Sequence, residues 1–176
     1  LLHYRIDADN SSSYGAWKRM GKPDKPSLEQ VKEIRKREEL ELYEEVKSLQ
    51  MAETLSFTVD LPMHAVSLFL LVPENTEKPV RPVILKANAE QGFSQSPQVF
   101  LKWKPSEEFD FFYYRIYRKR DDESGFTVIS DTPAVNTAVY VDMDVEEKHR
   151  YTYKVQAVNA SLASSDLSDE IEVQVP

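Results

Sequence analysis

The chain has 176 residues, which suits one or two domains and excludes a complete (β/α)₈ barrel of about 250 residues. Neither half is basic, with 11 basic against 14 acidic side chains before Pro79 and 11 against 16 from there on, so nothing draws the chain to nucleic-acid phosphates or an anionic membrane. A hydrophobic fraction of 41% is enough for a packed core, and the absence of cysteine excludes disulfides, thiolate metal sites and a cysteine nucleophile.

The first residues read as a strand in progress. Residue 1 is Leu rather than Met, and Leu1–Asp7 is already strand-like. We therefore expect a piece of a longer polypeptide; the alternative is a natural domain boundary at this point.

Two helices are predicted next, joined by a short turn. Asn10 or one of Ser11–Ser13 can cap a short helix, and Gly21 lies at its end with Pro23 just beyond. Ser27 and Gln30 form a capping box that starts a second helix, expected to run to about Leu40. Whether that helix continues through residues 42–49 is left open. The two helices predict a helical hairpin over about residues 10–40.

The sequence then predicts two strands, over 55–61 by alternation and over 66–72 as a nearly continuous apolar run. The longest apolar run, 65–72, is too short to span a bilayer. Three strands are too few to close a core, so we expect 1–73 to be the C-terminal part of a larger β-sandwich into which the helical hairpin is inserted.

Residues 74–82 are expected to be an extended, Pro-rich linker, and residues 83–176 a separate domain. Seven short strands with regular turn signals predict a two-sheet antiparallel sandwich. The fold class is therefore mainly β. The strands are expected near 83–87, 99–103, 114–120, 126–129, 137–141, 151–157 and 171–175.

The second region resembles a fibronectin type III domain. The resemblance is carried by Leu101–Trp103, Tyr114–Tyr117 and Tyr151–Asn159. It implies that Trp103 packs at the centre of the core and that Tyr151 is the corner tyrosine, whose hydroxyl ties back to the backbone. Such domains occur in receptors, adhesion proteins and enzymes, so they indicate fold more than function.

The order of motifs in the first region resembles the C-terminal part of the α-L-iduronidases of glycoside hydrolase family 39. These motifs are His3–Asp7, Trp17–Pro23 and Pro26–Gln30, followed by two strands and the fibronectin type III domain. The resemblance implies a lysosomal, retaining glycosidase that removes terminal α-L-iduronic acid from dermatan sulfate and heparan sulfate. It also implies that a catalytic barrel lies upstream in the same polypeptide and binds the glycosaminoglycan. The alternative is a non-catalytic interaction module of a receptor or matrix protein.

We expect no catalytic residue, cofactor or metal within this chain. Glu38–Glu39 and Glu44–Glu45 read as solvated charges, and the three histidines lack metal-ligand spacing.

Asn159 and Asn10 both stand in N-glycosylation sequons, and Asn159, before an expected exposed loop, is the better candidate. Trp17 is interpreted as an anchor of the helical hairpin, with a position at the rim of the active site as the alternative.

Overall fold

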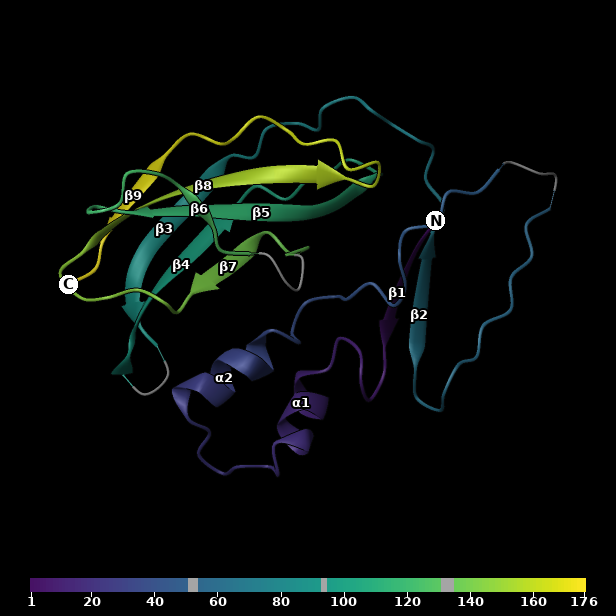
Figure 1. The fold of residues 1–176 in the computed structure, drawn as a ribbon, viewed down its shortest axis with the longest axis horizontal. Coiled ribbons are helices and arrows are strands. Elements are labelled where there is room, and N and C mark those ends of the chain that lie inside the picture. Colours follow the sequence, from purple (N-terminus) through teal and green to yellow (C-terminus); the bar gives the residue numbers. More distant parts are fainter. Residues whose placement is uncertain (51–53, 93–94, 131–134) are drawn as a thin grey trace. The chain divides into compact units, whose positions relative to one another are not determined.

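The computed structural model describes residues 1–50, 54–92, 95–130 and 135–176, which fall into two units, Leu1–Pro73 and Glu74–Pro176 (Figure 1). The secondary structure is mainly antiparallel β with two short helices. The predicted fold class, a helical hairpin within a small β region followed by a seven-stranded sandwich, is confirmed.

The first unit is built around a two-stranded antiparallel sheet. β1 (Leu2–Ile6) pairs with β2 (Val66–Leu70), so Tyr4 lies opposite Leu68. The other edge of β1 is bonded irregularly by residues 41–47, through the contacts Arg5 N to Glu41 O, Tyr43 N to His3 O and Lys47 N to Leu1 O. β1 is thus the most enclosed strand of this unit, and four of its five residues are buried.

The two helices begin and end where local signals place them. α1 (Ser13–Arg19) is capped by Ser12, whose side chain accepts from the amide of Gly15. Gly21 follows the helix with φ +84, a conformation that a residue without Cβ adopts at no steric cost. α2 (Leu28–Arg35) starts with the predicted capping box, and both of its hydrogen bonds are present. The helices pack against each other as a hairpin.

Two sequence predictions in this unit are wrong. α2 ends at Arg35 and does not reach Leu40, because Glu41 is held by Ser11 and Arg37 and draws the chain back toward β1. The alternating segment 55–61 forms no strand in its described residues. Alternating apolar and polar residues give a strand one buried and one exposed face. A strand also needs a neighbouring strand to accept and donate its backbone hydrogen bonds, and none of the described strands pairs with this segment.

The second unit is a sandwich of a three-stranded sheet and a four-stranded sheet. The sheet orders are β3-β4-β7 and β6-β5-β8-β9, the arrangement expected for a fibronectin type III domain (Figure 1). All seven predicted strands are present: β3 (Ile84–Gln91), β4 (Pro97–Trp103), β5 (Phe111–Arg120), β6 (Thr127–Val128), β7 (Val139–Asp142), β8 (Arg150–Asn159) and β9 (Ile171–Gln174). Inward side chains of both sheets fill the core, where Val99, Trp103, Ile116 and Val155 are fully buried.

The segment predicted as a linker is held against the second unit. The amide of Asn75 donates to Ser161 Oγ at 2.8 Å, and Asn75 Nδ2 donates to Asp110 Oδ2 at 2.8 Å. Lys78 and Arg81 form ion pairs with Asp166 and Asp169. Residues 74–82 are therefore an ordered N-terminal strap of the sandwich.

Neither α1 nor α2, which are the helices of the described residues, has the length and apolar character needed to cross a bilayer.

Candidate functional site

The first unit contains a cavity of about 290 Å³ beside β1. Two polar residues of its lining, His3 and Arg5, are each only 3% exposed. Phe57 and Phe69 add aromatic surface, with their ring centroids 4.8 Å apart. The cavity therefore combines buried cationic and aromatic groups.

The side chains of this buried pair are hydrogen-bonded to neighbouring segments. His3 Nδ1 lies 3.1 Å from Glu44 Oε1, and its Nε2 lies 3.0 Å from Ser67 Oγ. Arg5 donates from Nε to Ser67 Oγ at 3.2 Å and from Nη2 to the Asp60 carbonyl at 2.9 Å. The network links β1, β2 and the two irregular segments around Glu44 and Asp60, so its role is to hold them together.

Glu44, one of the two acidic residues that line this cavity, lacks the character of a glycosidase general acid. Its carboxylate is bonded to Lys47 and His3, and these contacts lower the pKa of Glu44 below its ordinary range. The general acid of a glycosidase needs a raised pKa so that it still carries a proton at working pH. Glu44 is therefore suited to binding a cation and not to donating a proton.

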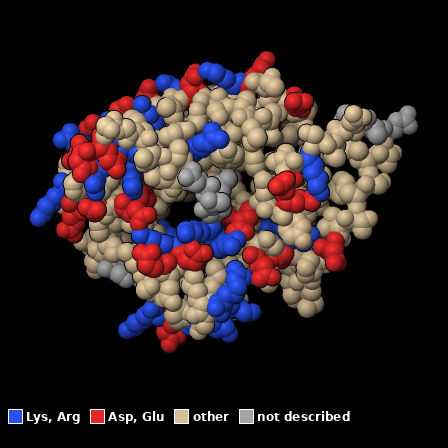
Figure 2. Space-filling model, viewed as in Figure 1, with Lys and Arg blue, Asp and Glu red and all other residues tan. Residues whose placement is uncertain are grey.

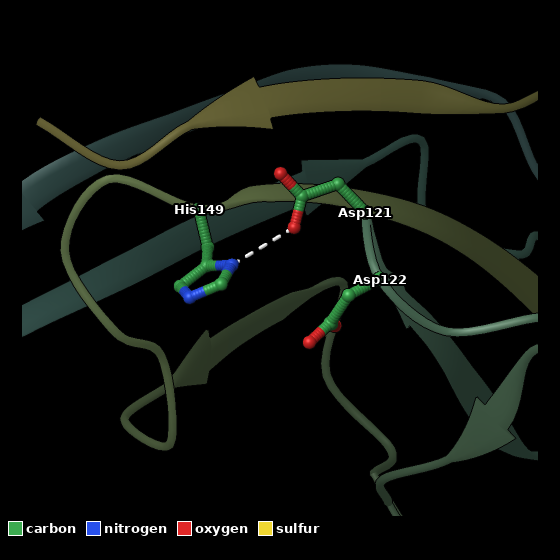
Figure 3. Close-up of side chains that lie close together, drawn as sticks. All are labelled: Asp121, Asp122 and His149. Atoms are coloured by element: carbon green, nitrogen blue, oxygen red, sulfur yellow. Dashed lines mark hydrogen bonds and ion pairs between the residues drawn. The ribbon is translucent and has the colours of Figure 1, made fainter.

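A second cluster, in the second unit, brings Asp121, Asp122 and His149 together, with their ligand atoms within 4.8 Å of one another (Figure 3). His149 Nδ1 lies 2.9 Å from Asp121 Oδ1, whereas both oxygens of Asp122 accept hydrogen bonds from the Arg120 guanidinium. A metal ion would have to compete with that guanidinium for Asp122. The arrangement is an ion-pair network that joins the turn after β5 to the start of β8, and it carries no metal assignment.

The residues expected to organise the sandwich core lie inside it. Trp103 is fully buried, and its ring meets Tyr114 edge-on at a centroid distance of 5.1 Å. The hydroxyl of Tyr151 accepts a hydrogen bond from the amide of Glu146 at 2.9 Å, the backbone tie expected of a corner tyrosine.

Trp17 is half-buried on α1, in the helical hairpin. Its Nε1 donates to the carbonyl of Pro23 at 3.1 Å, and its ring lies 5.6 Å from that of Tyr14. These contacts fasten the turn between α1 and α2 to the first helix. The hairpin anchor is therefore the role that the structure supports, and a position at an active-site rim stays a prediction.

The structure argues against the sequon at Asn159. This residue is 1% exposed, its Nδ2 donates to the carbonyl of Asn75 at 2.8 Å, and its Oδ1 accepts from the amides of Ser161 and Ala163. A glycan on that nitrogen would displace the strap of residues 74–82. The loop after Asn159 was expected to be exposed, and Leu162 in it is exposed, but the side chain of Asn159 itself turns inward.

Asn10 is half-buried, and its side-chain nitrogen donates to the carboxylate of Asp7. Ser12, not Asn10, caps α1. A modification at Asn10 stays a prediction.

Sequence reasoning missed a buried ion pair between the two sheets. Arg118 Nη1 donates to Asp142 Oδ2 at 2.9 Å, and the Tyr153 hydroxyl donates to the same oxygen at 2.9 Å. Burial alone would lower the pKa of Arg118, but the neighbouring Asp142 raises it above its ordinary value. The available signal was the position of Arg118, which shares the inward side of β5 with Tyr114 and Ile116.

A second missed feature is the outward face of β5. Tyr113, Arg115, Tyr117 and Lys119 alternate with the inward residues and therefore lie on one face of the four-stranded sheet. On the face of the molecule shown in Figure 2, acidic side chains lie between the basic ones. The row on β5 stands out because its cations alternate with aromatic rings.

Comparison with known proteins connects the chain to carbohydrate-active enzymes. No protein-family profile matches. An amylopullulanase of Thermoanaerobacter thermohydrosulfuricus is 36% identical over 95 residues, which are 53% of this chain and 6% of that enzyme. A Fn3-like protein from Clostridium thermocellum covers 57% of this chain, with 24% identity and a TM-score of 0.46.

The solved structure of a bacterial orthologue of human α-L-iduronidase covers 97% of this chain with a TM-score of 0.77 and 20% identity. The chain spans only 30% of the length of that structure. The likeness extends across both units and so includes the helical hairpin as well as the sandwich. The chain thus has the fold of a portion of that α-L-iduronidase structure, as the order of its motifs predicted.

Proposed function

We propose that this chain is the non-catalytic supporting region of a glycoside hydrolase that resembles α-L-iduronidase. The single observation that carries this proposal is the likeness over 97% of the chain to an iduronidase of which the chain spans 30%. A stand-alone fibronectin type III module would not need the first unit with its helical hairpin. The alternative, an interaction module of a receptor or matrix protein, accounts only for residues 74–176.

The sites described above support a structural role. The buried pair His3 and Arg5 is hydrogen-bonded to neighbouring segments, and Glu44 has the lowered pKa of an ion-paired carboxylate. Retaining hydrolysis needs two carboxyl groups about 5 Å apart, one of them with a raised pKa. The proposal therefore assigns the acid/base and the nucleophile to a catalytic barrel elsewhere in the parent polypeptide.

The finer parts of the proposal follow from the resemblance. The parent would release terminal α-L-iduronic acid from dermatan sulfate and heparan sulfate with retention, and it would act in the lysosome. The first unit supplies a physical reason for a partner. Ile6, Val66 and Leu68 of its small sheet are 47%, 61% and 44% exposed, and neighbouring exposed apolar side chains of this kind mark a surface that a further segment or partner covers.

The test compares this chain with the longest polypeptide that its gene encodes, using a fluorogenic α-L-iduronide. We expect no turnover by residues 1–176 and measurable turnover by the longer polypeptide. Turnover by the chain alone that is lost in Glu44→Gln would refute the assignment of the chemistry to other residues. If the longer polypeptide is folded and contains the acid/base and nucleophile carboxylates but shows no turnover, the proposed iduronidase activity is refuted.

A further inference from the structure

The outward face of β5 carries a regular alternation of aromatic and cationic side chains. In strand order they are Tyr113, Arg115, Tyr117 and Lys119, whereas the inward residues Tyr114 and Ile116 are 2% and 0% exposed. β5 lies between β6 and β8, so this row runs along the middle of the sheet and not along an edge. The row therefore lies on the face of the sheet, beside β8 along its length and beside β6 at Tyr117.

This face keeps an excess of positive charge in an acidic unit. From residue 74 onward the chain has 12 basic and 18 acidic residues, yet neither Arg115 nor Lys119 has an ion-pair partner among the described residues. Lys154, beside Tyr117 on β8, is paired with Glu170 at 2.8 Å, and the charge of Lys119 also acts on Glu170, whose pKa it helps to lower. Arg115, Lys119 and Lys154 together exceed the charge of this one carboxylate by two, which a negatively charged ligand can neutralise.

The side chains of this row are held in place before any ligand arrives. Arg115 donates from Nη2 to the Tyr113 hydroxyl at 2.9 Å and from Nη1 to Ser164 Oγ at 3.2 Å. The Tyr117 hydroxyl donates to Gln156 Oε1 at 2.8 Å. Lys119 Nζ lies 5.1 Å from the ring centroid of Phe126. A guanidinium has five N–H donors, so Arg115 keeps donors for a ligand, and ordered side chains lose less entropy on binding.

The spacing of the charges selects the kind of ligand. Arg115 and Lys119 are four residues apart on one strand, a separation of roughly 13 Å. A single carboxylate or sulfate cannot contact both, whereas a chain with repeated anionic groups can. The exposed part of Tyr117 lies between them and offers an aromatic surface to the apolar face of a sugar ring.

We propose that the face formed by Tyr113, Arg115, Tyr117 and Lys119 binds an acidic polysaccharide, a sugar chain with carboxylate or sulfate groups. An extended acidic peptide is the less suitable occupant, because peptides add to exposed sheet edges and β5 has a neighbour on each side. The inference rests on the proposed function only for the choice of a polysaccharide as the anionic polymer, since the proposed substrates, α-L-iduronides, are glycosides of a uronic acid and carry a carboxylate. Its role would be to hold the substrate chain near the enzyme.

The experiment uses the chain of residues 1–176 and a fluorescein-labelled dermatan sulfate hexasaccharide, followed by fluorescence anisotropy. We expect saturable binding at low salt that weakens as salt is added, because screening acts on exposed charges. Arg115→Gln/Lys119→Gln should bind at least fivefold more weakly, and Lys119→Gln alone at least twofold more weakly. The single variant keeps the hydrogen bonds of Arg115 and so remains informative if the double variant is poorly folded.

The matched control is Lys86→Gln/Lys102→Gln, which removes the same charge from the other sheet, where these two lysines lie opposite each other. It should bind within twofold of the unaltered chain. Equal weakening of binding in both double variants would overturn the proposal, since it would show a general electrostatic attraction without a specific site. Absence of binding to the unaltered chain would also overturn it. Equal affinity for poly-glutamate would assign the face to an acidic protein segment instead. None of these results depends on turnover, so this proposal and the proposed function can fail separately.

Discussion

Asp142→Ala removes the carboxylate that joins the two sheets of the second unit. This residue is 3% exposed and accepts hydrogen bonds from Arg118, the Tyr153 hydroxyl and the amide of Asp144. The substitution leaves the Arg118 guanidinium without its counter-charge, with a hydrogen bond to the Asp144 carbonyl remaining, and the buried Tyr153 phenol without its acceptor. In the unaltered chain burial raises the pKa of Tyr153, so its hydroxyl is a neutral donor for which Asp142 is the acceptor.

The expected cost is large for a domain of this size. Removing one member of a buried ion pair lowers the free energy of unfolding by about 3–5 kcal/mol, a sizeable fraction of the about 5–15 kcal/mol that stabilises a typical domain. At about 4 °C or more per kcal/mol for a sandwich of roughly 100 residues, the melting temperature should fall by at least about 12 °C. Calorimetry or thermal denaturation followed by near-ultraviolet circular dichroism measures this.

Two matched variants separate the loss of the hydrogen bond to Tyr153 from the cost of leaving a buried charge unpaired. Tyr153→Phe removes one hydrogen bond to a charged group and should cost about 1.5–3 kcal/mol. Arg118→Met/Asp142→Leu/Tyr153→Phe replaces the whole network by apolar side chains and should restore most of the stability lost in Asp142→Ala. A loss below about 1 kcal/mol for Asp142→Ala would refute the reasoning, because the pair would then not be buried in solution.

Three other predictions address single contacts. His149 holds the pKa of Asp121 below its ordinary value, so this stabilisation is complete above about pH 4 and is lost as the pH falls further. Asp121→Asn should therefore flatten the acid side of a melting-temperature profile, and an unchanged slope would contradict this. Trp17→Phe should lower the stability of the first unit by about 1 kcal/mol through the lost bond to Pro23, measured by denaturant titration, with unchanged turnover in the longer polypeptide. Peptide mapping of protein made in a eukaryotic host should find Asn159 unmodified; a glycan there would refute its burial.

Features encoded by neighbouring residues could be predicted from the sequence. Ser27 and Gln30 form their capping box within four residues, and Gly21 ends α1 by adopting a positive φ. The seven strands of the sandwich follow alternation over five to ten residues, and Trp103 and Tyr151 lie in the core. Each of these signals acts over a short stretch of chain.

Features that depend on distant residues could not be predicted in the same way. Segment 55–61 alternates but has no ladder partner among the described strands, and Asn159 turns inward to bind Asn75, 84 residues earlier. The pair of Arg118 with Asp142 joins two sheets whose packing no local pattern specifies. The row on β5 is an exception, because its alternation was visible in the sequence and only its exposure and missing ion pairs required the structure.

The strap of residues 74–82 determines where the sandwich can be cut if it is to be transferred to another protein as a module. Its pairs Lys78 with Asp166 and Arg81 with Asp169 each connect positions 88 residues apart. A graft that starts at Val83 would discard these connections and expose Asn159, whereas one that starts at Glu74 carries its own closure. Recombination between such modules, in the laboratory or in evolution, is therefore expected to succeed when the cut falls beside Pro73.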